Sequence, residues 1–199
     1  KPDMKIIKRD AMSGKPIAGT VFSIKSVTGS YSTSVTTGTD GSATLSAIPA
    51  GVYVVREESV PEPYIVTNTE QTVALRPGKT SEVTFVDYEK PGLEIIKKNI
   101  VNGEPIEGVT YRIEQIDGSF STSATTDNHG RIFLASIPVG SYKVTEINVP
   151  SHVILSPIPQ EVALKAGETS TVTFFNAIKP SLEIRKLDSV TGDPVKGAK

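Results

Sequence analysis

The sequence repeats itself with a fixed period of 89 residues. The segment MKIIKRDAMSGKPIAG begins at Met4, and related segments begin at Leu93 and Leu182. The register holds without a gap through both complete copies. A period of this size is too long for a solenoid and matches a compact domain. We therefore predict a domain at 1–91, a second domain at 92–180, and the N-terminal fragment of a third repeat at 181–199.

Within each repeat, short runs of β-branched and aromatic residues alternate with turn signals. In the first copy these signals include Ser13-Gly14, Asp40-Gly41 and Pro77-Gly78. No stretch shows a sustained helical period. Short strands separated by regular turns are typical of a β-sandwich. The sequence therefore predicts an all-β chain of tandem Ig-like β-sandwiches with about seven strands each.

The composition argues against several kinds of partner. The 21 basic and 22 acidic residues are spread along the chain and give a formal net charge of −1, so we expect no nucleic-acid partner. No apolar run is long enough for a spanning helix, so we expect no membrane insertion in this fragment. Cysteine is absent, and His129 and His152 have no counterparts in the first repeat, so we expect both histidines in turns or on the surface. We predict neither a metal site nor a cofactor.

Polar residues interrupt three apolar strand faces in each repeat. Because side chains alternate between the two faces of a strand, residues two apart share a face. This rule places Lys8, Glu57 and Asp87 at the ends of core-facing rows in the first repeat. The corresponding residues of the second repeat are Lys97, Glu146 and Asn176. A buried Lys or Glu is costly unless it is paired, so we expect each set of three to meet in its core.

Two interpretations of these residues remain open from the pattern itself. The first is a structural ion pair or hydrogen-bonded triad, since such networks also occur in cores. The second is a reactive triad, because burial favours a neutral Lys amine and a protonated Glu. The amine can then attack the side-chain carbonyl carbon of Asp or Asn while Glu transfers protons, which leaves an isopeptide bond.

At these residues the chain resembles the Cna protein B-type domains of Gram-positive surface adhesins and pilins. The resemblance covers both repeats and is carried by KRDAMSGKPIAGTVF, which begins at Lys8, and by YVVREESVPEPY, which begins at Tyr53. It implies a reverse-Ig, prealbumin-like sandwich. It also implies that the crosslinking lysines are Lys8 and Lys97, the catalytic acids Glu57 and Glu146, and the acceptors Asp87 and Asn176. The second repeat departs from the family pattern at Asn99, where Asp is usual, and at Val153, where Tyr is usual.

The resemblance leads us to expect a rigid stalk or spacer module of a bacterial cell-surface adhesin or pilus-like protein. Such a module is extracellular, attached to the cell wall through regions outside this fragment, and partnered by neighbouring repeats of its own chain. It is no enzyme beyond a single autocatalytic turnover. The alternative is a ligand-binding adhesin module that recognises host matrix or glycan. An exposed aromatic or apolar patch would favour this alternative over a pure spacer.

The fragment at 181–199 carries Lys186 but neither the Glu nor the acceptor strand of a complete repeat. We therefore expect Lys186 to stay a free, unpaired amine. The eighteen residues from Leu182 to Lys199 cannot form a core alone. We expect the fragment to be packed, either within a third domain or as a strand added to the edge of a neighbouring molecule.

Overall fold

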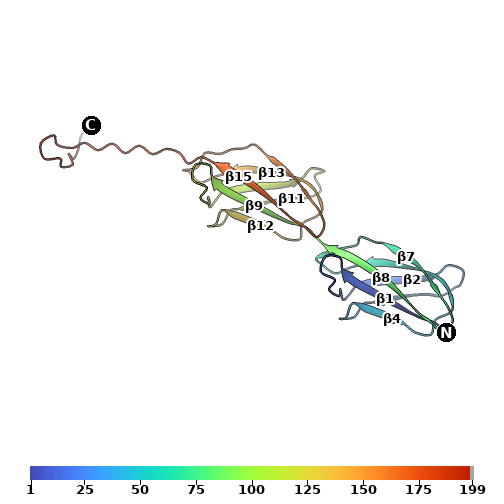
Figure 1. Ribbon diagram of the computed structural model, residues 1–199. Coiled ribbons are helices and arrows are strands. Elements are labelled where there is room, and N and C mark those ends of the chain that lie inside the picture. The colour runs from blue at the N-terminus through green and yellow to red at the C-terminus, as the bar shows by residue number, and fades with distance from the viewer. Residues whose placement is uncertain (198–199) are drawn as a thin grey trace.

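A computed structural model describes residues 1–197 and shows two β-sandwiches followed by an extended segment (Figure 1). The strands of the first sandwich are β1 (Asp3–Asp10), β2 (Val21–Ser26), β3 (Ser32–Thr36), β4 (Ser42–Leu45), β5 (Gly51–Ser59), β6 (Tyr64–Ile65), β7 (Glu70–Leu75) and β8 (Thr80–Glu89). Those of the second are β9 (Gly92–Asn99), β10 (Thr110–Gln115), β11 (Ser121–Thr125), β12 (Arg131–Leu134), β13 (Gly140–Asn148), β14 (Gln160–Leu164) and β15 (Thr169–Asn176). The predicted all-β fold with tandem sandwiches is confirmed. Within the described residues, no helix is long and apolar enough to cross a membrane.

Each sandwich packs two sheets face to face. In the first sandwich the strand orders are β4-β1-β8-β6 and β3-β2-β5-β7, and in the second they are β12-β9-β15 and β11-β10-β13-β14. The first and last long strands of each copy run parallel, side by side: β1 with β8, and β9 with β15. Because β1 and β8 run parallel, the chain enters the sandwich near one end and leaves it near the other (Figure 1).

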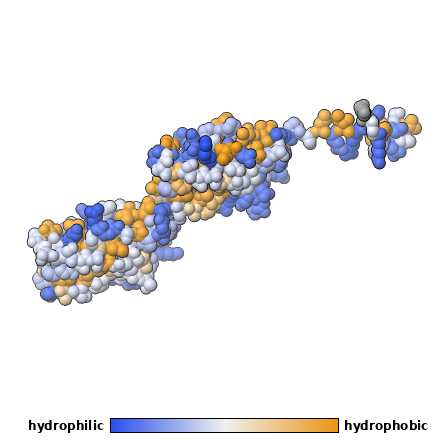
Figure 2. All heavy atoms as spheres, turned by 180° about the vertical axis from the view of Figure 1, so that it is seen from behind, coloured by the Kyte–Doolittle hydropathy of each residue, from blue (hydrophilic) through white to orange (hydrophobic). Residues whose placement is uncertain are grey.

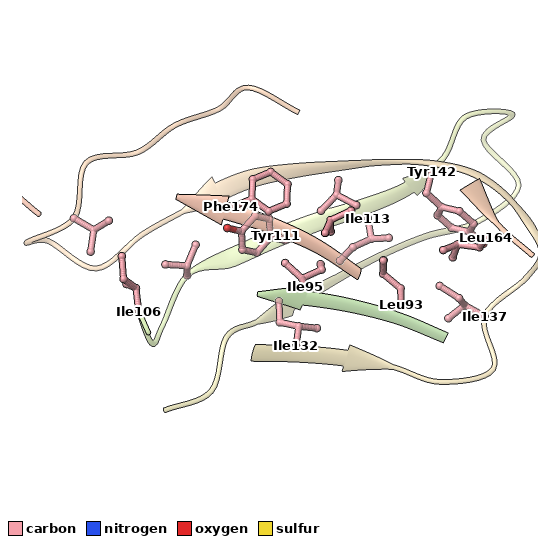
Figure 3. Packing of buried hydrophobic residues seen from close by; sticks show 14 residues of the cluster. Leu93, Ile95, Ile106, Tyr111, Ile113, Ile132, Ile137, Tyr142, Leu164 and Phe174 are labelled. Atoms are coloured by element: carbon pink, nitrogen blue, oxygen red, sulfur yellow. The ribbon is translucent and has the colours of Figure 1, made fainter. Parts of the chain in front are cut away.

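The period-2 pattern of the strands accounts for the cores. Along β1 burial alternates strictly, so Met4, Ile6 and Lys8 all point inward. Figure 3 shows the second core, in which Tyr111 and Phe174 pack with ring centroids 4.8 Å apart. The full set of buried apolar residues in this core is Leu93, Ile95, Ile106, Val109, Tyr111, Ile113, Ile132, Ile137, Tyr142, Val144, Val153, Leu164, Val172 and Phe174.

A glycine in each copy lets a turn approach the strand that carries the buried lysine. Gly130 has a φ of 68°, in the left-handed region that favours glycine. A Cβ at this position would collide with the carbonyl oxygen of Lys97 and lie 3.0 Å from the amide nitrogen of Ile106. Gly41 has the same role in the first copy, where its carbonyl accepts a 2.7 Å hydrogen bond from the Lys8 amide.

The two sandwiches lie end to end and meet through a narrow neck (Figures 1 and 2). Strand β8 ends at Glu89, and β9 begins at Gly92. The turn between β14 and β15 reaches back across this junction, where the Gly167 amide donates a 2.7 Å hydrogen bond to the Glu89 carbonyl. Gly167 also lies against the side chains of Tyr88 and Met12. A direct contact between the sandwiches therefore accompanies the short connection.

Residues 181–197 form no packed structure in the chain. All of them are exposed, Lys186 included, and a single isolated bridge joins Leu187 to Pro194. The expectation that this segment is packed is therefore wrong for the chain by itself. The physical reason is that β1 and β9 each lie between two strands of their own sheet, whereas the copy that begins at Leu182 has no such partners within the described residues. Lys199, the last residue of the predicted fragment, lies outside the described residues.

Candidate crosslinking site

Three strands bring the predicted residues of the first repeat together. Lys8 lies near the end of β1, Glu57 near the end of β5, and Asp87 near the end of β8. The side chains of all three are fully buried. In the parallel register, Lys8 lies opposite Phe85, so its long side chain reaches two residues along β8 to Asp87. The rule that residues two apart share a strand face, here called the parity rule, thus placed all three side chains on the correct face of their strands.

Lys8 joins two carboxyl groups. Its Nζ lies 2.8 and 2.9 Å from the two carboxyl oxygens of Glu57, and 2.8 Å from Oδ2 of Asp87. The contact with Asp87 Oδ2 is close in distance but lacks the angles of a hydrogen bond. Oδ1 of the same carboxyl accepts hydrogen bonds of 2.9 and 3.0 Å from the amide and hydroxyl of Thr67. The amine therefore lies beside the Asp87 carboxyl without being bound to it as an ordinary donor.

The burial and the charges of this site favour a proton on the Glu57 carboxyl. The pKa of Glu57 is raised to about 7: burial raises it most, the hydrogen bond and charge of Lys8 lower it, and the charge and hydrogen bonding of Asp87 raise it. Two carboxylates facing one ammonium in a dry core leave an uncompensated negative charge. Near neutral pH, Glu57 therefore exchanges between its acid and its ionised form, as a proton-transfer group must.

The second site has the same three strands and an amide in place of the second carboxyl. Lys97 Nζ donates to Oε2 of Glu146 at 2.7 Å, and Nδ2 of Asn176 donates to Oε1 of Glu146 at 2.6 Å. All three residues are buried. Burial lowers the pKa of Lys97, while the hydrogen bond and the charge of Glu146 act in the opposite direction. The site therefore makes a neutral amine easier to form next to the Asn176 amide.

The structure adds three residues that the sequence analysis did not single out. Thr67 binds the Asp87 carboxyl, whereas its counterpart Ser156 donates its amide to Oε1 of Glu146 at 2.9 Å. The hydroxyl of Tyr111 lies 3.3 Å from Oε2 of Glu146. Thr67 and Ser156 lie outside long strands, so parity could not find them. Tyr111 could have been found, because it is the one aromatic core position where a hydroxyl replaces the plain ring of Phe22.

The remaining polar candidates lie apart from these sites. His129 and His152 are exposed and lie in turns, as predicted. Asn99 and Val153, the departures from the family pattern, belong to neither triad, and Val153 packs in the second core. Across residues 1–197, no group of three or more His, Asp or Glu side chains is arranged to hold a metal ion.

Lys8 Nζ contacts both the Glu57 and the Asp87 carboxyls, and Glu146 contacts both Lys97 and Asn176. A buried amine, an acceptor side chain and a carboxyl group that can carry a proton are what amide formation requires. The same contacts also describe a buried ion pair. The fold and the site define a class of protein, the prealbumin-like β-sandwich with a buried Lys, Glu and Asp or Asn. A sequence model of the SpaA family, described as a prealbumin-like fold domain, matches residues 2–89 and 91–178. The chain therefore belongs to this family, and the resemblance to such domains is confirmed.

Solved structures share the fold at low sequence identity. The shaft pilin SpaA of Lactobacillus rhamnosus GG is 16% identical over 92% of this chain and 99% of that chain, with a TM-score of 0.52. The minor pilin GBS52 of Streptococcus agalactiae is 16% identical over 94% of this chain and 100% of that chain, with a TM-score of 0.44. The Bacillus anthracis TIE protein is 22% identical over 88% of this chain and 34% of that chain, with a TM-score of 0.47. This chain thus spans about a third of the TIE protein. No curated protein matches the sequence.

Proposed function

We propose that the chain is a rigid stalk module whose two sandwiches close themselves with isopeptide bonds, Lys8 to Asp87 and Lys97 to Asn176. The observation that carries this proposal is the position of each triad. It is fully buried and joins the first strand of a sandwich to the last. A structural ion pair could sit anywhere in a core, whereas a covalent bond at this position closes nearly the whole domain. This placement favours the reactive interpretation.

In the first sandwich the bond forms with loss of water. The neutral amine of Lys8 attacks Cγ of protonated Asp87, and a bond forms between Nζ and Cγ. Glu57, in its acid form, passes its proton to the departing oxygen and accepts one from Nζ. The bond between Cγ and that oxygen breaks, and water leaves. Glu57 returns to its starting state, so it acts once in each molecule as a proton-transfer group.

In the second sandwich the bond forms with loss of ammonia. The neutral amine of Lys97 attacks Cγ of Asn176, and Glu146 accepts a proton from Nζ through Oε2. Glu146 passes a proton to Nδ2, the bond between Cγ and Nδ2 breaks, and ammonia leaves. Both reactions end in the same secondary amide, which reducing agents do not cleave.

The strand geometry gives these bonds a mechanical role. Tension between the two ends of a sandwich pulls β1 and β8 past each other, because the strands are parallel neighbours and the first and last of the copy. A bond between Lys8 and Asp87 joins the two strands that the tension pulls on, so the residues between Lys8 and Asp87 are shielded from extension. The chain-entropy model gives about 4 to 5 kcal/mol of added stability for a loop of this length.

We place the module outside the cell, in a surface protein or pilus-like assembly anchored to the cell wall through other regions. Membership of the SpaA family and the pilin names of the similar structures support this placement. Its partners are neighbouring modules of the same chain, as the contact of Gly167 with Glu89 suggests.

The alternative, a module that binds host matrix or glycan, has weaker support. Phe133 and Phe175 are the two exposed phenylalanines, and both lie on the outer face of the second sandwich. Phe133 pairs with Glu94 and Phe175 with Lys98, so charged residues adjoin both, four positions apart along β9. Figure 2 shows hydrophobic and hydrophilic residues intermingled over the face in view. The two rings do not form one aromatic platform.

Single-molecule stretching of the whole chain tests the proposed role. We expect both sandwiches to resist extension, because neither 8–87 nor 97–176 can lengthen once bonded. The matched control is the double variant Glu57→Ala, Glu146→Ala, in which each sandwich should release about 250 Å of chain on unfolding. Equal extension of the wild-type chain and the control would contradict the stalk proposal.

A further inference from the structure

The carboxyl group of Glu146 divides its two oxygens between two tasks. Oε2 faces the nucleophile Lys97 and the hydroxyl of Tyr111, whereas Oε1 faces Nδ2 of Asn176 and the amide of Ser156. Glu57 has no such division, because both of its oxygens lie within 2.9 Å of Lys8 Nζ. Phe22, at the position of Tyr111, has no hydroxyl, and Thr67, the counterpart of Ser156, donates its amide to Asp87 instead.

The second copy gives its glutamate three donors that Lys8 does not supply in the first: the Tyr111 hydroxyl, the Ser156 amide and Nδ2 of Asn176. Tyr111 occupies the position of Phe22, and each ring packs 4.8 Å from the phenylalanine of the last strand, Phe174 or Phe85. The packing of the ring is therefore the same in both copies. Burial raises the pKa of Tyr111, and the charge of Glu146 raises it further, so the phenol stays a donor. Figure 3 shows Tyr111 beside Phe174 within the second core.

The two leaving groups make different demands on the glutamate. In the first copy a protonated Asp87 supplies the oxygen that leaves, and Thr67 already binds this carboxyl directly. In the second copy the amide nitrogen of Asn176 must receive a proton before ammonia can leave. A carboxyl group with one oxygen on the amine and the other on the amide is placed to serve both steps.

Resting on the proposed bond formation, we propose that Tyr111 is a positioning residue of the second site, whose hydroxyl holds Oε2 of Glu146 on Lys97 and thereby keeps Oε1 on the leaving nitrogen of Asn176. Ser156 supports the same orientation from the other oxygen. The second copy thus carries a device matched to its amide acceptor, which the first copy lacks.

The test compares bond formation in newly synthesised full-length chains that carry Tyr111→Phe. Cell-free synthesis is stopped, samples are quenched with acid at intervals, and peptide mass spectrometry follows the two bonds separately. We expect the Lys97–Asn176 bond to form about tenfold more slowly, the loss expected when a carboxylate loses one hydrogen bond. The Lys8–Asp87 bond of the same molecule is the internal control and should keep its rate.

The pH profile separates positioning from packing. Without the phenol donor the Glu146 carboxylate is less stabilised, so the acid side of the pH–rate profile for ammonia loss should move to higher pH. A packing defect would slow the bond equally at every pH. The reciprocal variant Phe22→Tyr should leave the second bond unchanged.

Three results are distinguishable. A slower second bond with a shifted profile supports the inference. An unchanged rate and profile in Tyr111→Phe, with both bonds forming in the wild-type chain, or a slower rate with no shift, overturns the inference alone. Absence of the second bond from the wild-type chain overturns the proposed function, and the inference with it.

Discussion

Burial sets the chemistry of Lys8 and Lys97. An ammonium taken out of water is costly, and so is a carboxylate beside it, so transfer of a proton between them costs less in the core than at the surface. In the first site the same environment holds Lys8 Nζ 2.8 Å from Oδ2 of the Asp87 carboxyl. A buried Lys and Glu pair is therefore at once a weak source of stability and a good starting point for amide formation.

Replacing Glu57, the proposed catalytic acid, should remove one bond only. In Glu57→Ala we expect the Lys8–Asp87 bond to be absent and the Lys97–Asn176 bond to be complete, since each triad lies in its own core. Intact mass then shows the loss of ammonia without the loss of water. Formation of both bonds in this variant would remove Glu57 from the mechanism.

The two bonds should also respond differently to pH. The first site needs two protons among Lys8, Glu57 and Asp87, and the pKa of Glu57, raised from 4.5 to about 7, keeps its acid form up to that pH. Above it this proton is lost, so the rate of the first bond should fall about tenfold for each further pH unit. The second site needs one proton, which Lys97 and Glu146 share.

The measurement follows both bonds by mass spectrometry in newly made chains shifted to between about pH 6 and pH 9. The second bond should keep its rate between about pH 7 and pH 8, where the first already slows. Parallel slowing of both bonds above about pH 7 would show that Glu57 does not set the pH range in which the first bond forms.

At the scale of the strand, alternation of side chains made most of the site predictable. Lys8, Glu57 and Asp87 follow apolar residues of the same parity, and a one-residue slip would have exposed the whole row. The parallel pairing of β1 and β8 also followed, because two buried partners near the C-terminal ends of their strands meet only if the strands run the same way.

What parity could not predict lies outside the long strands. Thr67 and Ser156 occupy corresponding positions, yet one binds the acceptor and the other binds the glutamate. The acceptor is a carboxyl in the first copy and an amide in the second, and these contacts form only once the three strands have come together. The two-residue strand β6 has no hydrophobic period to reveal it.

The turn that supports β9 gives a prediction at this scale. In Gly130→Ala the new Cβ meets the Lys97 carbonyl and the Ile106 amide at a left-handed φ. We therefore expect the free energy of unfolding of the second sandwich to fall by about 2 to 4 kcal/mol. The matched control is Gly103→Ala, which has a φ of 74° but open space, and should lose about 1 kcal/mol. Urea unfolding measures the stability of both variants in a Glu146→Gln background, in which the proposed second bond should not form. Equal losses would show that the turn can shift.

At the scale of the whole chain, the repeat made the domain order predictable and the last segment was misjudged. The two sandwiches keep their register because each copy supplies its own partner strands, and the contact of Gly167 with Glu89 joins them. The copy that begins at Leu182 has the sequence of a first strand without the sheet that a first strand needs, so residues 181–197 stay exposed.

The intact mass of the purified chain tests the central claim most directly. Both bonds together predict a mass lower than the sequence mass by one water, from Lys8 and Asp87, and one ammonia, from Lys97 and Asn176. Mass analysis of proteolytic fragments should then place each loss in a branched peptide that joins the first strand of a sandwich to its last. A mass equal to that of the sequence would leave only buried ion pairs and would contradict the account.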